Sequence, residues 1–195
     1  MIISSFKIRK ITQIISNSYF RKTFSKFGVA AGVEHISALT SLGEINTIVD
    51  IGCYRGQFSL AARYAFPKAN IIAFEPLEKA ADVYQSVFAN DSKVHLVTAA
   101  VGPNSGEATI YVSNSDDSSS LLPMTEQQCS LFPGTELART QTIITVRLVE
   151  KVRAQDLSAQ ALLKLDVQGF ELDSLAGCED LINYFSWVYV ECSFV

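Results

Sequence analysis

From Ile45 onward, the sequence alternates short apolar runs with segments of helical periodicity, and this alternation limits the fold more than any other feature. Strands separated by helices are typical of β-α-β units, in which parallel strands form one sheet with helices on both faces. The sequence therefore predicts an α/β domain with a mostly parallel sheet. The predicted strands are residues 47–51, 71–74, 94–101, 108–112, 142–149, 161–167 and 187–192, the predicted helices are residues 58–66, 77–89 and 170–184, and residues 121–137 are irregular.

The first 40 residues form a separate basic segment before the predicted domain of residues 41–195. Residues 1–33 contain six basic and no acidic side chains, whereas the rest of the chain contains ten basic and twenty acidic ones. Apolar residues at helical spacing predict one or two amphipathic helices over residues 2–27. Such helices can bind an anionic membrane surface, or they can pack on the domain with the basic face in water. We favour packing, because most amphipathic helices of globular chains are half buried.

The composition excludes several classes of protein. Hydrophobic residues make up 48% of the chain and charged residues 18%, which is enough to bury a core. The net charge of −4 argues against a nucleic-acid partner. No apolar stretch approaches the roughly 18 residues of an integral membrane segment. The four cysteines lie far apart, which fits neither a zinc site nor a disulfide framework, so we expect a reducing, cytoplasmic location.

Ligands of such sheets bind at the carboxyl ends of the strands, so the turn after the first strand is the first candidate site. It contains Asp50, Gly52 and Gly56 in the pattern D-x-G-x-x-x-G. Gly52 permits a tight turn, and Gly56 lets the backbone approach a ligand closely. The turn has one glycine fewer than the G-x-G-x-x-G motif of dinucleotide enzymes, which favours a ligand without a bridging diphosphate. Glycine-rich turns also occur for purely conformational reasons.

Glu75 and Pro76 follow the second strand. Glu75 lies 23 residues after Gly52, close to the spacing of about 20 at which an acidic side chain accepts hydrogen bonds from ribose hydroxyls. A carboxylate can accept both hydroxyls at once. The alternative is an ordinary acid at a helix N-terminus, stabilised by the helix dipole. The glycine turn upstream favours the ribose interpretation.

Two charged residues occupy the end of a predicted buried strand. Lys164 and Asp166 share one face of that strand, because they are two residues apart. Burying both charges is costly unless they pair or reach a cleft, which indicates a functional rather than a structural role. Glu171 opens the next helix, where it can also simply favour the helix dipole.

Together these segments resemble the FkbM-type methyltransferases, a family of Rossmann-like, S-adenosylmethionine-dependent enzymes. The matching motifs are VDIGCYRGQFS, AFEP, AAVGPNSGEATIYVS with SSSL, LLKLDVQGFELDSLAG and VYVECSF. The resemblance implies S-adenosyl-L-methionine as cofactor and methyl transfer to a hydroxyl of a small-molecule or carbohydrate acceptor. It also implies that Asp50, Gly52, Cys53 and Gly56 frame the methionine part, that Glu75 binds the ribose, and that Asp166 lies beside the methyl group. We assign Tyr54, Pro76 and Ala100, within the same motifs, to the cofactor site.

The sequence departs from the family in two places. Positions 53 and 54 are Cys and Tyr, where the family usually has Ala-Asn. The chain also ends at Val195, near the end of the fifth parallel strand, where the family's fold continues into two further strands. An unpaired sheet edge is a site of association. We therefore expect either a fragment of a longer protein or an oligomer or partner that covers this edge.

Methyl transfer needs a group that removes the proton of the acceptor hydroxyl. Asp166 is the candidate base, with Lys164 or Glu171 as orienting partners, because His35 precedes the first strand and His95 lies at the wrong end of its strand. No cluster of metal ligands is evident, so we expect no metal. The alternatives are an NAD-dependent oxidoreductase and a protein that binds the cofactor without turnover. We also predict that residues 113–120, a loop of small polar residues, lie over the cleft and are mobile without ligand.

Overall fold

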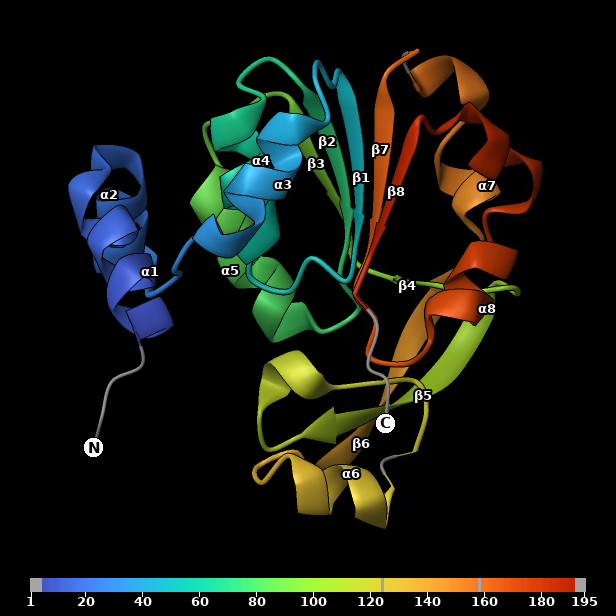
Figure 1. The fold of residues 1–195 in the computed structure, drawn as a ribbon. Coiled ribbons are helices and arrows are strands. Elements are labelled where there is room, and N and C mark those ends of the chain that lie inside the picture. The colour runs from blue at the N-terminus through green and yellow to red at the C-terminus, as the bar shows by residue number, and fades with distance from the viewer. Residues whose placement is uncertain (1–4, 124, 158, 192–195) are drawn as a thin grey trace.

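A five-stranded parallel sheet forms the centre of the computed structural model, which describes residues 5–123, 125–157 and 159–191 (Figure 1). Its strand order is β3-β2-β1-β7-β8, and each neighbouring pair is parallel. The fold class predicted from the sequence is therefore confirmed, including its Rossmann-like arrangement. The strands are β1 (Thr47–Ile51), β2 (Asn70–Phe74), β3 (Val94–Val97), β7 (Ala161–Leu165) and β8 (Trp187–Val190).

Helices cover both faces of this sheet, as Figure 1 shows. Alternate residues of β1 and β7 face opposite sides. Ile48 and Leu162 pack with Phe58 on the side of α4, whereas Val49 and Leu163 pack in the core on the side of α7 and α8. Both strands are buried along their whole length, which explains their continuous apolar sequences. The helices of the two faces are η1 (Val33–His35), α3 (Ile36–Ser41), α4 (Gln57–Ala65) and α5 (Glu78–Phe88) on one side and α7 (Leu148–Lys151), η3 (Ala154–Asp156), α8 (Glu171–Ala176) and η4 (Glu179–Tyr184) on the other.

The basic N-terminal segment folds as two helices, α1 (Ser5–Ser16) and α2 (Ser18–Phe27), while residues 1–4 lie outside the described part of the chain. Asn17 separates the helices, and its Oδ1 caps α2 by accepting the N–H groups of Tyr19 and Phe20. Phe20 is buried and lies 5.2 Å from the ring of Tyr64 in α4. The helix pair is thus packed on the domain. Among the described residues, no helix is long and apolar enough to cross a membrane.

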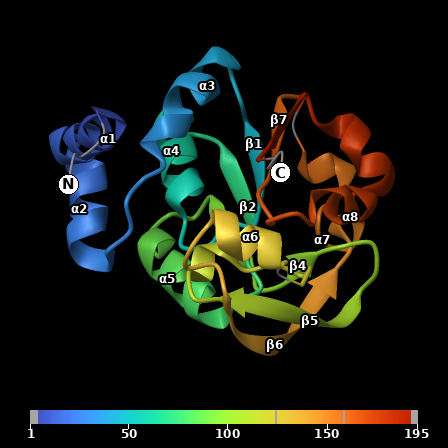
Figure 2. The ribbon, with the colours of Figure 1, turned by 60° about the horizontal axis from the view of Figure 1, so that its bottom comes forward.

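A second, three-stranded sheet lies at the carboxyl end of the first, and Figure 2 brings this end forward. It contains β4 (Ala100–Val101), β5 (Gly106–Ser113) and β6 (Leu137–Val146), with β5 and β6 antiparallel. The prediction of one strand over 94–101 was wrong, because the chain turns at Thr98, where the Ala99 N–H bonds the Val97 carbonyl. Beyond this turn, β4 pairs with β6 instead of continuing in the large sheet.

Other predicted boundaries also need correction. The strand expected over 142–149 begins at 137 and ends at 146, because Leu148 turns into α7 and its N–H bonds the Gly177 carbonyl. The helix expected over 170–184 is broken at Gly177, where an added Cβ would lie 2.2 Å from the Gly102 carbonyl oxygen. The strands expected to reach 167 and 192 end at 165 and 190. The irregular region includes the short helix α6 (Glu126–Leu131) and the loop includes η2 (Asp116–Ser118).

The turns after β1 and β7 touch at a glycine. Gly52 has a left-handed φ of +76°, and an added Cβ would lie 1.9 Å from the Asp166 carbonyl oxygen. Any other residue at position 52 must therefore push the β7 turn away. This contact places the glycine turn of β1 directly against the turn that carries Asp166.

We expect Gly52→Ala to lower the free energy of unfolding by about 3 kcal/mol or more, the sum of left-handed strain and overpacking. Gly43→Ala is the matched control, because Gly43 has φ +81° but no atom within 4 Å of an added Cβ. It should lose only about 1–2 kcal/mol, from strain alone. Urea unfolding of both variants measures the difference. Equal losses would show that the two turns can separate freely.

Candidate active site

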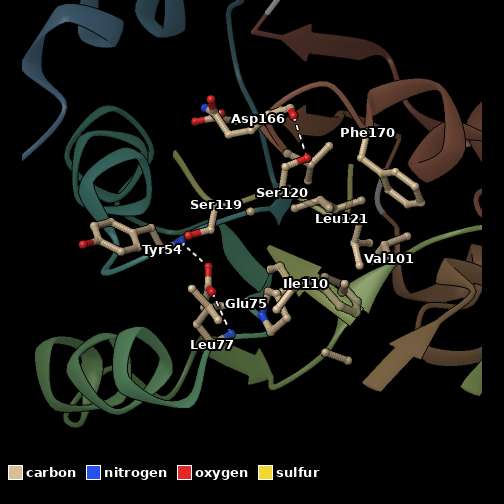
Figure 3. Close-up of a pocket in the computed structure, with 18 of the residues that line it drawn as sticks. Tyr54, Glu75, Leu77, Val101, Ile110, Ser119, Ser120, Leu121, Asp166 and Phe170 are labelled. Atoms are coloured by element: carbon tan, nitrogen blue, oxygen red, sulfur yellow. Dashed lines mark hydrogen bonds between the residues drawn. The ribbon is translucent and has the colours of Figure 1, made fainter. Parts of the chain in front are cut away.

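A cavity lies between the carboxyl ends of the large sheet and the small sheet (Figure 3). It contains about 610 Å³ of empty space, part of which is open to solvent. Residues from both sheets and their connecting loops line it: Ile51, Gly52, Tyr54, Phe74, Glu75, Pro76, Leu77, Ala99, Ala100, Val101, Ile110, Asp117, Ser119, Ser120, Leu121, Asp166, Val167, Gln168 and Phe170.

About half of the predicted site residues line this cavity. Gly52, Tyr54, Glu75, Pro76, Ala100 and Asp166 are among the lining residues, whereas Asp50, Cys53, Gly56, Lys164 and Glu171 are not. The residues at the wall are those directly after β1, β2 and β7, together with Ala100 of β4. The others support the wall from the core or from the adjoining turns.

Glu75 is a buried carboxyl group in the cavity wall, with 5% of its surface exposed. The Tyr54 N–H donates to its Oε2 at 2.9 Å, and the Leu77 N–H donates to its Oε1 at 2.9 Å. Burial raises the pKa of Glu75 to about 7, although these two N–H donors lower it. Each oxygen can accept a further hydrogen bond, so the fixed carboxyl can receive two hydroxyl donors from a ligand.

Tyr54 links the turn after β1 to Glu75 through that backbone bond. Its φ of +48° is left-handed, which is uncommon for an aromatic residue and marks local strain. The Arg55 guanidinium lies 4.9 Å from the centre of the Tyr54 ring. Tyr54 thus lines the cavity, while its backbone N–H holds the carboxyl group of Glu75.

Gly56 and Cys53 both lie against the buried apolar cluster around Tyr84. An added Cβ at Gly56 would lie 2.8 Å from the Phe88 ring and 3.1 Å from the Tyr84 ring, so glycine is required there by the packing of α4 on α5. Cys53 is buried in the same apolar cluster as Tyr84. Burial raises the pKa of its thiol well above the ordinary value. The structure thus gives Gly56 a packing role, and its close approach to a ligand stays a prediction.

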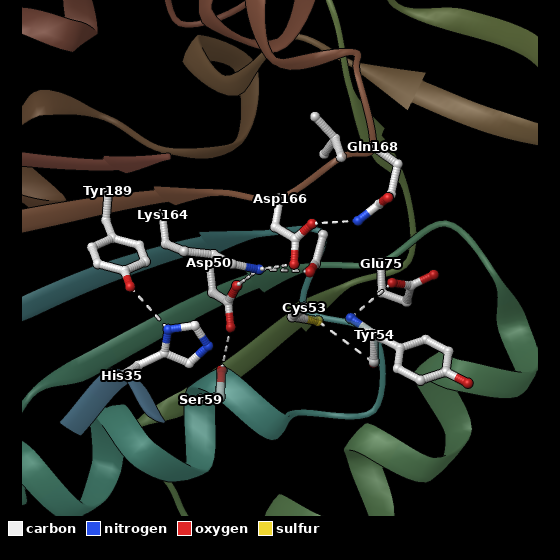
Figure 4. Close-up of polar contacts among 12 residues, drawn as sticks. His35, Asp50, Cys53, Tyr54, Ser59, Glu75, Lys164, Asp166, Gln168 and Tyr189 are labelled. Atoms are coloured by element: carbon white, nitrogen blue, oxygen red, sulfur yellow. Dashed lines mark hydrogen bonds and ion pairs between the residues drawn. The ribbon is translucent and has the colours of Figure 1, made fainter. Parts of the chain in front are cut away.

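Asp50 and Lys164 form a buried ion pair in the middle of the sheet (Figure 4). They are direct neighbours in the register of β1 and β7, and Lys164 Nζ lies 3.1 Å from Asp50 Oδ1. The same ammonium group donates to the Gly52 carbonyl at 2.8 Å. Ser59 Oγ donates to Asp50 Oδ2 at 2.7 Å. Burial disfavours the charge of Lys164, but Asp50 and then Asp166 outweigh this effect and hold the pKa of Lys164 above its ordinary value.

Asp166 stands at the cavity end of β7, and 27% of its side chain is exposed. Gln168 Nε2 donates to its Oδ1 at 2.8 Å, and Lys164 Nζ lies 3.6 Å from its Oδ2. These contacts fix the orientation of the carboxylate. Glu171, the other predicted partner, instead accepts the N–H groups of Gly169 and Val167 at 3.0 and 3.3 Å and so closes its own turn.

Three wall residues, in or next to the predicted loop of residues 113–120, were given no individual role in the sequence analysis. Ser119, Ser120 and Leu121 line the cavity, and Ser120 Oγ donates to the Gln168 carbonyl at 2.8 Å. The polar loop predicted to lie over the cleft is thus placed at the cavity, whereas its mobility stays a prediction. The serine run was the only signal for this contact, because Ser120 and Gln168 are 48 residues apart.

His35 also lies closer to the sheet than the sequence suggests. Its Nδ1 is 2.9 Å from the Tyr189 hydroxyl, and its ring contacts Phe58 edge-on at 5.4 Å. His35 does not line the cavity. His95 lies in β3, opposite Ile72, and is likewise not in the cavity wall. Within the part of the chain that the structure describes, no three His, Cys, Asp or Glu side chains converge to hold a metal ion.

The fold and cavity define a Rossmann-like domain whose site lies at the carboxyl ends of β1, β2 and β7. The chain belongs to the FkbM methyltransferase family, since the model of the methyltransferase FkbM domain matches residues 50–195. It is 26% identical over 152 residues to the 2-O-methyltransferase NoeI of Sinorhizobium fredii (strain NBRC 101917 / NGR234), with 75% of this chain and 63% of that protein covered. It is 28% identical over 172 residues to the methyltransferase sdnD of Sordaria araneosa, with 75% and 66% covered. The chain thus spans just under two thirds of the length of these relatives.

We expect Lys164→Met to destabilise the fold by about 3–5 kcal/mol, because it leaves the Asp50 carboxylate buried without its cation. The double variant Asp50→Asn, Lys164→Met should be more stable than Lys164→Met alone, since neither charge of the buried pair remains. Arg153→Met removes one partner of the exposed Arg153–Asp156 pair and should leave the unfolding midpoint nearly unchanged. Urea unfolding compares the three variants, and an unaffected Lys164→Met would contradict the importance of the pair.

Proposed function

We propose that the protein transfers a methyl group from S-adenosyl-L-methionine to a hydroxyl oxygen of a small-molecule or carbohydrate acceptor. The observation that carries the proposal is Glu75, a buried carboxyl group at the end of β2 that lines the cavity and is held by two backbone N–H groups. Membership of the FkbM family supports a methyl donor. A relative named as a 2-O-methyltransferase favours oxygen as the acceptor atom.

The cavity wall has the donors and surfaces that such a cofactor needs. Glu75 would accept the ribose hydroxyls, and the apolar surface of Pro76, Leu77 and Ala100 would contact the nucleobase. The turn at Gly52 and Tyr54 would hold the methionine part. Asp50, Cys53 and Gly56 would act on the site indirectly, by keeping this turn in place. When bound, the cofactor supplies a methyl group on a positively charged sulfur.

The residues at the end of β7 would then prepare the acceptor. Asp166 would take the hydroxyl proton, because its carboxylate lies in the cavity wall. Lys164 and Gln168 hold that carboxyl group in one orientation, because Lys164 Nζ lies 3.6 Å from its Oδ2 and Gln168 Nε2 lies 2.8 Å from its Oδ1. Glu171 would support the site by fixing the turn before α8.

We place the reaction in the cytoplasm. The three described cysteines, Cys53, Cys129 and Cys178, are free thiols, as expected in a reducing compartment.

The edge strand β8 exposes Trp187 and Val188. An exposed apolar edge of a sheet is a site of association, so we propose that a further part of the chain or a partner covers it. The aligned regions cover only 63% and 66% of the two relatives. We therefore propose the acceptor and any partner for the whole protein, of which this domain is the part that matches.

We expect binding of S-adenosylhomocysteine to strengthen by at most about tenfold from pH 6 to pH 8, because ribose hydroxyls donate better to ionised Glu75, whose pKa is about 7. Glu75→Gln should weaken binding by about 1–3 kcal/mol and remove this pH dependence. The free energy of unfolding changes in the opposite direction. Because the pKa of Glu75 is raised from 4.5 to about 7 by folding, the folded protein loses stability as the pH rises from about 4.5 to 7. Glu75→Gln should make this loss smaller. Calorimetry and urea unfolding at each pH measure both effects, with NAD as a ligand that should not bind.

We expect Asp166→Asn to bind S-adenosylhomocysteine nearly normally and to lose methyl transfer by about a hundredfold or more. Asparagine keeps the shape of the side chain but cannot accept the proton. The assay follows tritium from labelled S-adenosylmethionine into a panel of sugars and polyols. Asp173→Asn in the first turn of α8 is the control and should transfer normally. Wild-type transfer in Asp166→Asn would remove Asp166 as the base, whereas cofactor binding without any wild-type transfer would favour the non-catalytic alternative.

A further inference from the structure

Two rows of polar side chains cross the ends of β1, β7 and β8 on the face toward α4. The register of the three strands aligns Asp50, Lys164 and Tyr189 in the first row. Two residues further along the strands, Asp166 and Glu191 form the second row on the same face. The pairing continues beyond the strand ends, because the Asp166 N–H bonds the Ile51 carbonyl at 3.1 Å and the Glu191 N–H bonds the Leu165 carbonyl at 3.0 Å.

This register places Glu191 next to Asp166, on the same face of the sheet. The negative charge of Asp166 and, after it, burial raise the pKa of Glu191. Asp166 accepts a hydrogen bond from Gln168 and lies close to the ammonium group of Lys164, whereas Glu191 is exposed to water. Neighbouring carboxyl groups repel each other when both are ionised, so two of them side by side hold one proton more tightly than a lone carboxylate does.

We propose that Glu191 is the second carboxyl of the methyl-transfer site and that, with Asp166, it receives the proton of the acceptor hydroxyl. This inference rests on the proposed function. The acceptor O–H bond breaks and its proton passes to the ionised pair, while the O–CH3 bond forms and the C–S bond breaks with its electrons remaining on sulfur. The proton is then shared by the two carboxyl groups until the exposed Glu191 releases it to water.

Four other groups set the charge around the pair. Lys164 of β7 lowers the pKa of Glu191, and Glu171, at the start of α8, raises it. Tyr189 of β8 shares a face of its strand with Glu191, whose charge raises the pKa of Tyr189, and Asp166 raises and Lys164 lowers the pKa of His35 in η1. The hydrogen bond between His35 and Tyr189 keeps these two rings in place beside the pair. Glu191 therefore acts through Asp166 as a positioning residue and proton relay.

The test combines carbon-13 NMR titration of the carboxyl groups in the cofactor-free protein with the pH profile of methyl transfer. In wild type, Asp166 and Glu191 should titrate together in two steps. In Glu191→Gln, the upper step should disappear, transfer at neutral pH should fall about tenfold, and the acidic limb of the profile should move down by about one pH unit. Glu191→Asp should restore part of each effect, and Asp173→Asn should change none of them.

The outcomes separate this inference from the proposed function. An upper titration step that persists in Glu191→Gln would overturn the inference even in a protein that transfers methyl groups. An unchanged pH limb with lower activity would also overturn it, because it indicates a merely structural residue. If the pair titrates as expected but the wild-type protein neither binds S-adenosylhomocysteine nor transfers methyl groups, the proposed function fails, and the proton-accepting role of Glu191 fails with it. A urea unfolding midpoint equal to that of wild type shows that Glu191→Gln is folded.

Discussion

The buried ion pair between Asp50 and Lys164 is the interaction on which the rest of the site depends. Two charges in the middle of a sheet are stable only if each is fully paired, and here the pair also binds the Gly52 carbonyl and the Ser59 hydroxyl. Lys164 thus joins β7 to the turn after β1. The same turn donates the N–H that holds Glu75. One cation in the core therefore fixes two walls of the cavity without lining it.

Much of the fold can be predicted from the sequence where burial alone decides the structure. The strands β1, β2 and β7 are apolar runs because helices cover both faces of the sheet, and this signal is local. The turn at Thr98 and the break at Gly177 depend on contacts with distant chain: β4 pairs with Thr145 and Val146, and Gly177 packs against Gly102. No periodicity in the local sequence contains these partners. The predicted ends of strands and helices were therefore wrong at the positions where contacts with distant chain, and not the local sequence, determine where an element ends.

The residues of the candidate site can also be divided into those that the sequence could place and those that it could not. Position after a strand was sufficient to place Glu75 and Asp166 in the cavity wall, because carboxyl ends of parallel strands meet at one edge. Spacing could not show that Lys164 lies behind the wall, since the same face of a strand contains both buried and exposed positions. Nor could it pair Ser120 with Gln168 or place Glu191 beside Asp166, because these residues come from separate parts of the chain.

The charges around the cavity also bear on the identity of the donor. Carboxyl groups of Asp50, Glu75, Asp166 and Glu191 gather at the end of the sheet, and Lys164 is the cation paired with two of them. Such a site favours a positively charged ligand, because an incompletely compensated carboxylate in a partly buried site attracts a cation more strongly than it does in water. The proposed donor carries that positive charge on sulfur and loses it on transfer. The same carboxyl groups that attract the donor would therefore hold its neutral product less tightly, which favours release after each turnover.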